Sequence, residues 1–203
     1  ETGGIKNIIF DVGQVLVDYD WETYLDSFGF EPAKRERIAK ATFQSPVWDE
    51  RDRGLYEEDV YLKQFQELDP EDAEDIEKVI RGTGGTIHKR PYADTWVKYL
   101  KSKGYHVYIL SNYSSYMLDH TKKELTFRRE MDGEVFSCYA KQLKPDAEIY
   151  QTILNKYQLK PEECVFIDDR SENCRGAQEQ GIHTICFKDF KQVTADLEKL
   201  GVK

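Results

Sequence analysis

The sequence NIIFDVGQVLVDYD, residues 7–20, begins with a run of apolar residues that ends at the carboxylate of Asp11. A near-continuous apolar run of this length predicts a strand over residues 7–12 that is buried on both faces, as strands in parallel sheets are. Gly13 follows two residues after the acid. A buried strand that leads directly into a charged side chain indicates that Asp11 stands at a functional edge of the sheet.

The rest of the chain contains four more apolar runs of the same type. They lie at residues 106–112, 134–140, 164–169 and 183–187. Amphipathic helical patterns lie between or after these runs, at residues 92–104, 147–157, 171–181 and 192–200. Strands that alternate with helices in this way predict an α/β fold with a doubly wound parallel sheet.

A long segment separates the first predicted strand from the second. A crossover between parallel strands needs only about a dozen residues, whereas the second strand is predicted to begin at residue 106. Four helical patterns fill the segment, at residues 21–28, 32–43, 57–68 and 71–82. We therefore expect an all-helical insert over residues 18–88 and a core formed by residues 1–17 and 89–203, with the GTGG sequence at 82–85 as a hinge.

The composition is that of a globular protein with an acidic surface. The 203 residues are 39% hydrophobic and 33% charged, and the formal net charge is -9. This charge disfavours nucleic acid and anionic membranes as partners, and no apolar run approaches the roughly 18 residues that span a bilayer. The four cysteines have no zinc-site spacing and suit a reducing compartment. We expect a cytoplasmic protein that is a monomer or a weak dimer.

Polar and charged residues follow four of the five predicted strands. They are Asp11, Ser111, Asn112, Lys144, Asp168 and Asp169. In open parallel sheets, ligands bind beyond the carboxyl ends of the strands, so these side chains are expected to share one edge. Three neighbouring carboxylates need a counter-charge, and Mg²⁺ takes a few protein oxygens together with substrate phosphate. A lysine and a serine hydroxyl could hold a phosphoryl group there, while one carboxylate attacks phosphorus.

Each of these residues also has an ordinary structural explanation when it is considered alone. An acid that ends a strand is often a helix cap or turn former, and Ser111 and Asn112 are typical turn residues. Lys144 alone is a solvated charge, and the pair Asp168–Asp169 could form a cap with Ser171. The presence of all of them, in order and at one edge, favours a shared phosphoryl-transfer site.

Four motifs in order carry a resemblance to a known family. They are IIFDVGQVLVD, VYILSN, KPDAEIY and VFIDDRSENCRGAQEQGI. The sequence resembles the haloacid dehalogenase superfamily, a phosphatase-rich group of Rossmann-like enzymes, of the subfamily with a helical cap inserted after the first strand. FDVGQVLVDYD and RDRGLYEEDVY look like the subgroup that contains α-D-glucose-1-phosphate phosphatase. The resemblance implies a Mg²⁺-dependent phosphatase for a small phosphorylated metabolite, such as a sugar phosphate.

The resemblance also implies a role for each matching residue. Asp11 would be the nucleophile that forms an aspartyl phosphate, and Lys144 would stabilise charge on the phosphoryl group and on Asp11. Ser111 and the backbone of Asn112 would hold phosphoryl oxygens, while Asn173 would support the loop of the fourth motif. The implied Mg²⁺ ligands are Asp11, the backbone carbonyl of Gly13, Asp168 and Asp169.

Gly13 is where the sequence departs from most phosphatases of this superfamily. They carry an acid there, whose side chain is the general acid and base and whose carbonyl binds the metal. Gly13 keeps the carbonyl and loses a proton-transfer group worth roughly 10²–10⁴-fold in rate. The glucose-1-phosphate phosphatase subgroup shares this glycine, and an acid from the cap or from the substrate could substitute.

Several alternatives stay open at this point. Haloacid dehalogenases also lack the second acid and carry SN after the second strand, but they need no metal and lack the pair Asp168–Asp169. A non-catalytic relative would explain Gly13, and a phosphomutase depends most on the missing acid. In the cap, we expect Trp48, Arg51 and Arg53 in a loop, where Trp48 could stack on a sugar and Arg53 could clamp a phosphate; they could equally be a core anchor and solvated charges.

Overall fold

The strand β1 (Asn7–Phe10) lies at the centre of a five-stranded parallel sheet with the order β5-β4-β1-β6-β7. Its neighbours are β4 (His106–Ser111), β5 (Gly133–Phe136), β6 (Cys164–Asp168) and β7 (His183–Cys186). Phe10 pairs with Ile109 on one side and Ile167 on the other, so Asp11 follows level with the ends of both neighbours. The computed structural model describes residues 4–203, and within them the predicted α/β fold with a parallel sheet is confirmed.

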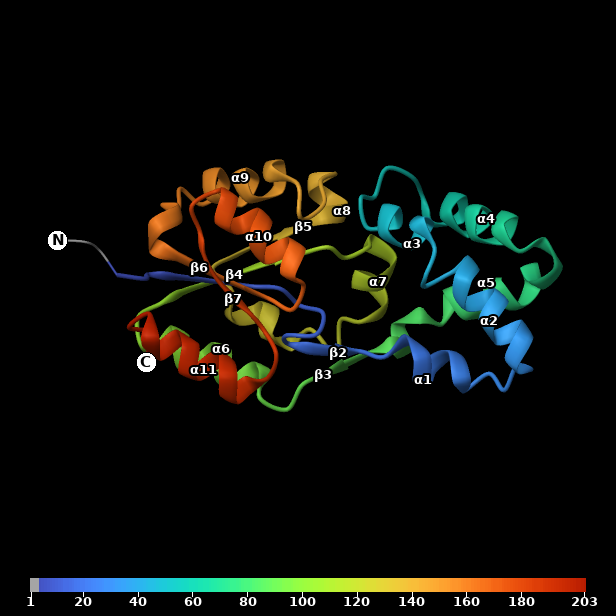
Figure 1. Cartoon of the computed structure of the whole chain (residues 1–203), viewed down its shortest axis with the longest axis horizontal. Coiled ribbons are helices and arrows are strands. Elements are labelled where there is room, and N and C mark those ends of the chain that lie inside the picture. The colour runs from blue at the N-terminus through green and yellow to red at the C-terminus, as the bar shows by residue number, and fades with distance from the viewer. Residues whose placement is uncertain (1–3) are drawn as a thin grey trace.

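Helices cover both faces of this sheet (Figure 1). One face carries α6 (Ala93–Ser102) and α11 (Phe190–Lys199), whose buried side chains include Val97 and Val193. The other face carries α9 (Ala147–Lys156) and α10 (Ser171–Glu179), which bury Ile153 and Ala177. Alternate β1 residues enter the two apolar layers, Ile8 with the first and Ile9 with the second, which is why β1 reads as continuously hydrophobic.

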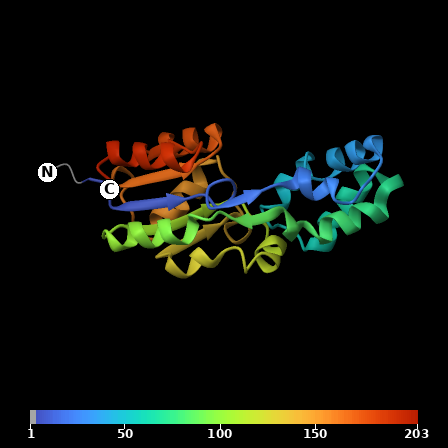
Figure 2. The same cartoon turned by 90° about the horizontal axis from the view of Figure 1, so that it is seen from below.

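The segment after β1 forms a separate helical lobe, the cap, at one end of the elongated molecule (Figure 2). Its helices are α1 (Trp21–Asp26), α2 (Pro32–Ala41), α3 (Pro46–Arg51), α4 (Glu58–Leu68) and α5 (Ala73–Arg81), with a 3-10 turn η1 (Pro70–Asp72) before α5. They bury an apolar cluster of their own that includes Leu25, Ile38, Phe65 and Ile76. The cap therefore has its own core.

Two short antiparallel strands join the cap to the sheet. They are β2 (Val17–Tyr19) and β3 (Ile87–Lys89). The 3-10 turn η2 (Thr83–Thr86), at the predicted hinge, directly precedes β3. The insert over residues 18–88 is thus not wholly helical, because strand residues pair across both of its predicted ends. Strands of three residues are too short to show a hydrophobic period. The predicted core begins at residue 1, and its first three residues lie outside the described part.

Three further elements differ from the sequence-based expectations. The strand predicted over 134–140 ends at Phe136, because its partner β4 ends at Ser111, and α8 (Ser137–Ala140) follows. The expected loop around Trp48 is the helix α3, which Pro46 initiates by fixing φ in the first turn. Helix α7 (Ser115–His120) is capped by the Ser114 hydroxyl and was not anticipated.

The remaining elements are the 3-10 turns η3 (Thr126–Glu130) and η4 (Pro161–Glu163), which connect helices to the strands that follow them. Among residues 4–203, no helix combines the length and apolar character that crossing a bilayer requires.

Candidate active site

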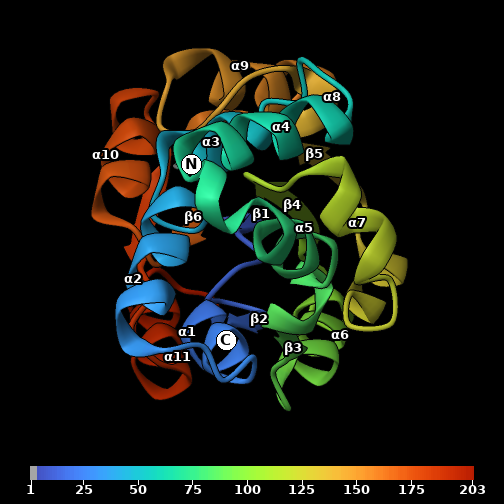
Figure 3. The ribbon, with the colours of Figure 1, turned by 90° about the vertical axis from the view of Figure 1, so that its right-hand side faces the viewer.

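A cavity of about 790 Å³ lies between the carboxyl ends of the central strands and the cap. Asp11, Lys144 and Asp169 line it from the core, and Trp48 and Asp52 line it from the cap. Viewed from the cap end, the cap helices stand in front of the sheet and cover this edge (Figure 3). The cavity is therefore placed where ligands bind in open parallel sheets.

Lys144 is the charged centre of the site. Its Nζ lies 3.0 Å from a carboxylate oxygen of Asp11 and 2.7 Å from one of Asp168, and it donates a hydrogen bond to the Leu110 carbonyl oxygen at 3.0 Å. Burial opposes a charge on this side chain, but Asp11 and Asp168 outweigh burial and raise the pKa of Lys144. The lysine is therefore a fixed cation within the site and is not a solvated surface charge.

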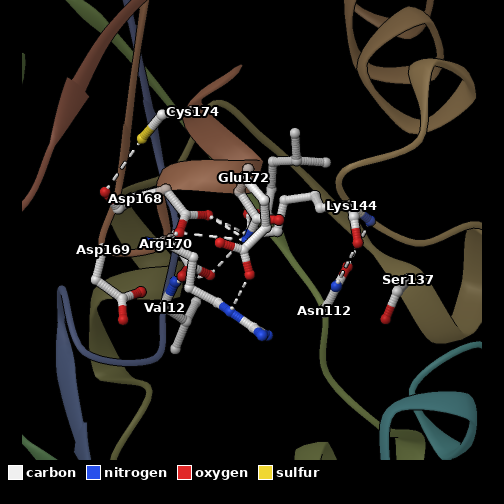
Figure 4. A network of polar contacts seen from close by, with 12 residues as sticks. Val12, Asn112, Ser137, Lys144, Asp168, Asp169, Arg170, Glu172 and Cys174 are labelled. Atoms are coloured by element: carbon white, nitrogen blue, oxygen red, sulfur yellow. Dashed lines mark hydrogen bonds and ion pairs between the residues drawn. The ribbon is translucent and has the colours of Figure 1, made fainter. Parts of the chain in front are cut away.

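Asp168 and Asp169 have different surroundings despite being adjacent. Asp168 is fully buried and accepts hydrogen bonds from Lys144, from the backbone NH of Arg170 at 2.9 Å and from Asn173 Nδ2 at 3.2 Å. In Figure 4 Asp168 belongs to a network of polar contacts, and the carboxyl group of Asp169 points away from that network. Asp169 is the member of the pair that lines the cavity, so Asp168 positions Lys144 while Asp169 faces the cavity.

The three acids fit a hard divalent cation. Oxygens of Asp11, Asp168 and Asp169 lie within 4.8 Å of one another. Burial raises the pKa of Asp11 to about 8, with a further increase from Asp168 that Lys144 only partly offsets. Burial and Asp168 also raise the pKa of Asp169 to about 6. The site therefore holds more negative charge than its one lysine compensates, and an all-oxygen donor set of this type suits Mg²⁺.

Ser111 and Asn112 end β4 beside this cluster. The Ser111 side chain is buried, and its Oγ has no hydrogen-bond partner among residues 4–203, although Ser111 itself is not among the residues that line the cavity. The side chain of Asn112 accepts from the Lys144 backbone NH at 2.9 Å and donates to the Lys144 carbonyl at 3.1 Å. Asn112 thus also fixes the segment that carries Lys144, a role that the sequence did not reveal.

The three cap residues singled out in the sequence differ in whether they line the cavity. Trp48 lines the cavity and packs against Phe43 with ring centroids 4.8 Å apart, so it is both a wall of the site and part of the cap core. Arg51 is buried and paired with Glu58 at 2.6 Å, outside the cavity lining. Arg53 pairs with Glu50 at 3.0 Å and also lies outside the cavity lining, so its phosphate clamp stays a prediction.

The structure adds cavity residues that sequence reasoning missed. From the cap and its connecting strands these include Tyr19, Trp21, Phe43, Asp49 and Asp52. Acids within a charged stretch and aromatics within helical patterns have no signal that separates a cavity wall from an outer surface.

A doubly wound core, a helical cap and a buried carboxylate–lysine site at the strand ends together define a capped hydrolase of the Rossmann-like class. The sequence model of the haloacid dehalogenase-like hydrolase family matches residues 5–181, and the chain belongs to this family.

Characterised relatives include phosphatases. The chain is 25% identical over 196 residues to sesquiterpene phosphatase from Aspergillus oryzae, covering 96% of each protein. It is 27% identical over 191 residues to D-ribitol-5-phosphate phosphatase from Bacteroides thetaiotaomicron, covering 89% of this chain and 90% of that one. A solved HAD family enzyme from the same bacterium, in complex with magnesium and inorganic phosphate, shares the fold with a TM-score of 0.73 at 23% identity, over 94% of this chain and 99% of that one.

Proposed function

We propose that this protein is a Mg²⁺-dependent phosphomonoesterase that hydrolyses a small phosphorylated metabolite through an aspartyl phosphate on Asp11. The observation that carries the proposal is the buried ion-pair cluster of Asp11, Lys144 and Asp168, with Asp169 beside it on the cavity wall. Membership of a hydrolase family that includes phosphatases supports the same reaction.

In this mechanism, a carboxylate oxygen of Asp11 attacks phosphorus and the bond to the leaving oxygen breaks. The ammonium of Lys144, held by Asp168 and by the Leu110 carbonyl, stabilises negative charge on Asp11 and on the phosphoryl oxygens. The hydroxyl of Ser111 and the backbone of Asn112 hold phosphoryl oxygens at the end of β4. Mg²⁺ held by Asp11, Asp169 and the Gly13 carbonyl would neutralise phosphate charge and orient the phosphoryl group.

The substrate that we propose is a phosphorylated sugar or a similar polyol, such as glucose 1-phosphate. The aromatic wall of the cavity supports this, because Tyr19 and Trp48 lie stacked with ring centroids 6.1 Å apart and a sugar face can pack against such rings. A relative that acts on D-ribitol 5-phosphate supports a polyol, whereas the sesquiterpene phosphatase favours a more apolar group. A substrate panel should therefore contain glucose 1-phosphate, ribitol 5-phosphate and a prenyl phosphate.

The test is phosphate release from this panel, measured with Mg²⁺ and with a chelator. We expect turnover that needs Mg²⁺ and that disappears in Asp11→Asn, with the exposed Asp119→Asn on α7 as the matched control. Activity that persists in Asp11→Asn would overturn the nucleophile assignment. Chloride release from 2-chloropropionate in the presence of the chelator would point to a dehalogenase instead.

A non-catalytic binding role is the second candidate, because Gly13 supplies no acid or base. It predicts that Mg²⁺ and inorganic phosphate bind while no ester of the panel is hydrolysed. Calorimetric titration with Mg²⁺, followed by phosphate, distinguishes this outcome from an inactive preparation.

A further inference from the structure

The space beside Gly13 is open. Among residues 4–203, a Cβ added to this residue would have no heavy atom within 4 Å apart from its chain neighbours, and Gly13 itself lines the cavity. No described core side chain therefore packs against the point where an acid side chain would begin. If the proposed phosphatase reaction occurs, the group that transfers the proton has to reach this space from elsewhere on the cavity wall.

Within the described residues 4–203, five acids line the cavity, and four of them are unsuited to this task. In the proposed mechanism, Asp11 is the nucleophile and Asp169 is a Mg²⁺ ligand, and both belong to the cluster of three acids. Asp49 is exposed, and Glu172 is exposed and paired with Arg170 at 2.9 Å. The fifth acid is Asp52, which is half-buried and lines the cavity from the cap, whereas Lys144 and Asp11 line it from the core.

The cap segment that carries Asp52 is attached to the core by specific contacts. The Ser137 hydroxyl donates to the Asp52 carbonyl oxygen at 2.6 Å, and the same oxygen of Ser137 accepts from the Tyr113 backbone NH at 2.9 Å. Ser137 is the first residue of α8. The hydroxyl therefore connects the end of α3 to the core loop that follows β4 and its phosphate-binding residues.

Gly54 completes this attachment. Its φ of +72° is a conformation that L side chains rarely adopt, and a Cβ here would lie 2.6 Å from the Cys138 carbonyl oxygen. Lys141 donates to the Gly54 carbonyl oxygen. The segment 52–54 can approach α8 this closely only because residue 54 is glycine, so Asp52 is held over the cavity by tertiary contacts and not by chance loop geometry.

We propose that Asp52 is the general acid and base of the reaction and takes the role for which residue 13 has no side chain. This rests on the proposed phosphatase function. In the first step, Asp11 forms its bond to phosphorus, the bond from phosphorus to the leaving oxygen breaks, and that oxygen takes the proton of the Asp52 carboxyl group to become an alcohol. In the second step, the Asp52 carboxylate takes a proton from the water that attacks phosphorus, the bond to Asp11 breaks and phosphate leaves.

The surroundings of Asp52 suit both steps near neutral pH. Burial raises the pKa of Asp52 to about 7, with the charges of Arg51, Lys144 and Arg170 lowering it and that of Asp49 raising it. Burial raises the pKa of three neighbouring groups, Tyr19, Tyr113 and Cys138, and the charge of Asp52 raises it further. A general acid and base works best when its pKa lies near the working pH.

The experiment compares two leaving groups in Asp52→Asn. The release of an alkyl alcohol from a sugar phosphate needs a proton in the transition state, whereas the release of p-nitrophenolate does not. We expect kcat for the sugar phosphate to fall roughly 10²–10⁴-fold, as for loss of a general acid, and its decline at alkaline pH to disappear. The first step with p-nitrophenyl phosphate, measured as the nitrophenolate burst, should change by less than about threefold.

Two further variants complete the test. Glu57→Gln removes an exposed acid at the start of α4 and should leave both substrates unaffected. Gly13→Asp in the Asp52→Asn background supplies an acid where there is room for it and should restore turnover of the sugar phosphate.

Equal effects of Asp52→Asn on both substrates would overturn the inference, because a misplaced cap or a poorly folded variant lowers both. The same leaving-group difference in Asp49→Asn but not in Asp52→Asn would also overturn it. If wild-type protein is active, Asp11→Asn is inactive and Asp52→Asn is fully active, the role of Asp52 fails while the phosphatase function stands. If wild-type protein hydrolyses no ester, the proposed function itself fails.

Discussion

Replacement of Lys144 by methionine tests the electrostatic structure of the site most directly. Methionine preserves much of the apolar side chain, but it removes the only lysine between two buried carboxylates at 3.0 and 2.7 Å. Breaking a buried ion pair by removing one partner costs about 3–5 kcal/mol, because the remaining charge is buried without compensation. We use the lower end, about 3 kcal/mol, because the pKa of Asp11 is about 8, so that near neutral pH Asp168 is the carboxylate that loses its charged partner.

This loss should be visible in the melting temperature. For a chain of this size, 1 kcal/mol shifts Tm by about 2–4 °C, so Lys144→Met should melt about 6–12 °C below wild type in a chelator. The variant site also carries one more net negative charge, so added Mg²⁺ should raise its Tm more than it raises that of wild type. Differential scanning calorimetry with and without Mg²⁺ measures both effects.

The control is Lys63→Met, which removes an exposed lysine of α4 and should change Tm by less than about 1 °C. An unchanged Tm for Lys144→Met in the chelator would show that the lysine is not a compensating buried charge. A Mg²⁺-induced shift no larger than that of wild type would show that the cation does not share the site with the lysine. Either result would refute the account of the cluster given above.

Three other predictions concern the same region. In a chelator, the contribution of Asp11 to the free energy of unfolding should fall as pH rises from about 4 to about 8, because the folded state retains a proton that the unfolded chain releases above pH 3.8. Urea unfolding measured across this pH range should show the decline, and saturating Mg²⁺ should make the decline smaller. Asn173→Ala removes a side-chain donor to both carboxylate oxygens of Asp168 and should raise the Mg²⁺ concentration for half-maximal activity about 10-fold or more. Titration of activity with Mg²⁺ measures this change, and coinciding curves for the variant and the wild type would disprove it. Gly176→Ala places a Cβ 2.6 Å from the Pro145 carbonyl oxygen and should destabilise the protein by about 1–3 kcal/mol in urea unfolding; wild-type stability would mean that α9 and α10 can separate without cost.

The parallel sheet and the charged edge of the candidate site could be predicted from sequence for one physical reason. Strands buried on both faces are continuously apolar, so each can be recognised from a few consecutive residues. The carboxyl ends of parallel strands lie at the same edge of the sheet. Asp11, Lys144 and Asp169 could therefore be placed together without knowledge of any contact. Register confirms why: Phe10 pairs with both Ile109 and Ile167, so the residues that follow these strands are neighbours in space.

The division of roles within the edge could not be predicted in this way. Adjacent residues such as Asp168 and Asp169 have the same local pattern, yet one is enclosed by three donors and the other faces the cavity. The Glu50 partner of Arg53 could not be foreseen for a related reason, because an arginine in a charged stretch does not reveal which acid it will pair with. Such differences depend on which atoms close around each side chain after folding.

The sequence by itself determined the α/β class and the acids that follow the strands at the end of the sheet, because these follow from periodicity and strand direction over short segments. Only the tertiary structure decided what the cap brings to that edge. The contact between Ser137 and Asp52 joins residues 85 apart in the chain, and it forms only because Gly54 lets the cap segment approach α8 closely. Whether an acid of the cap faces Gly13 is thus set by the packing of two separately formed cores, which no local pattern encodes.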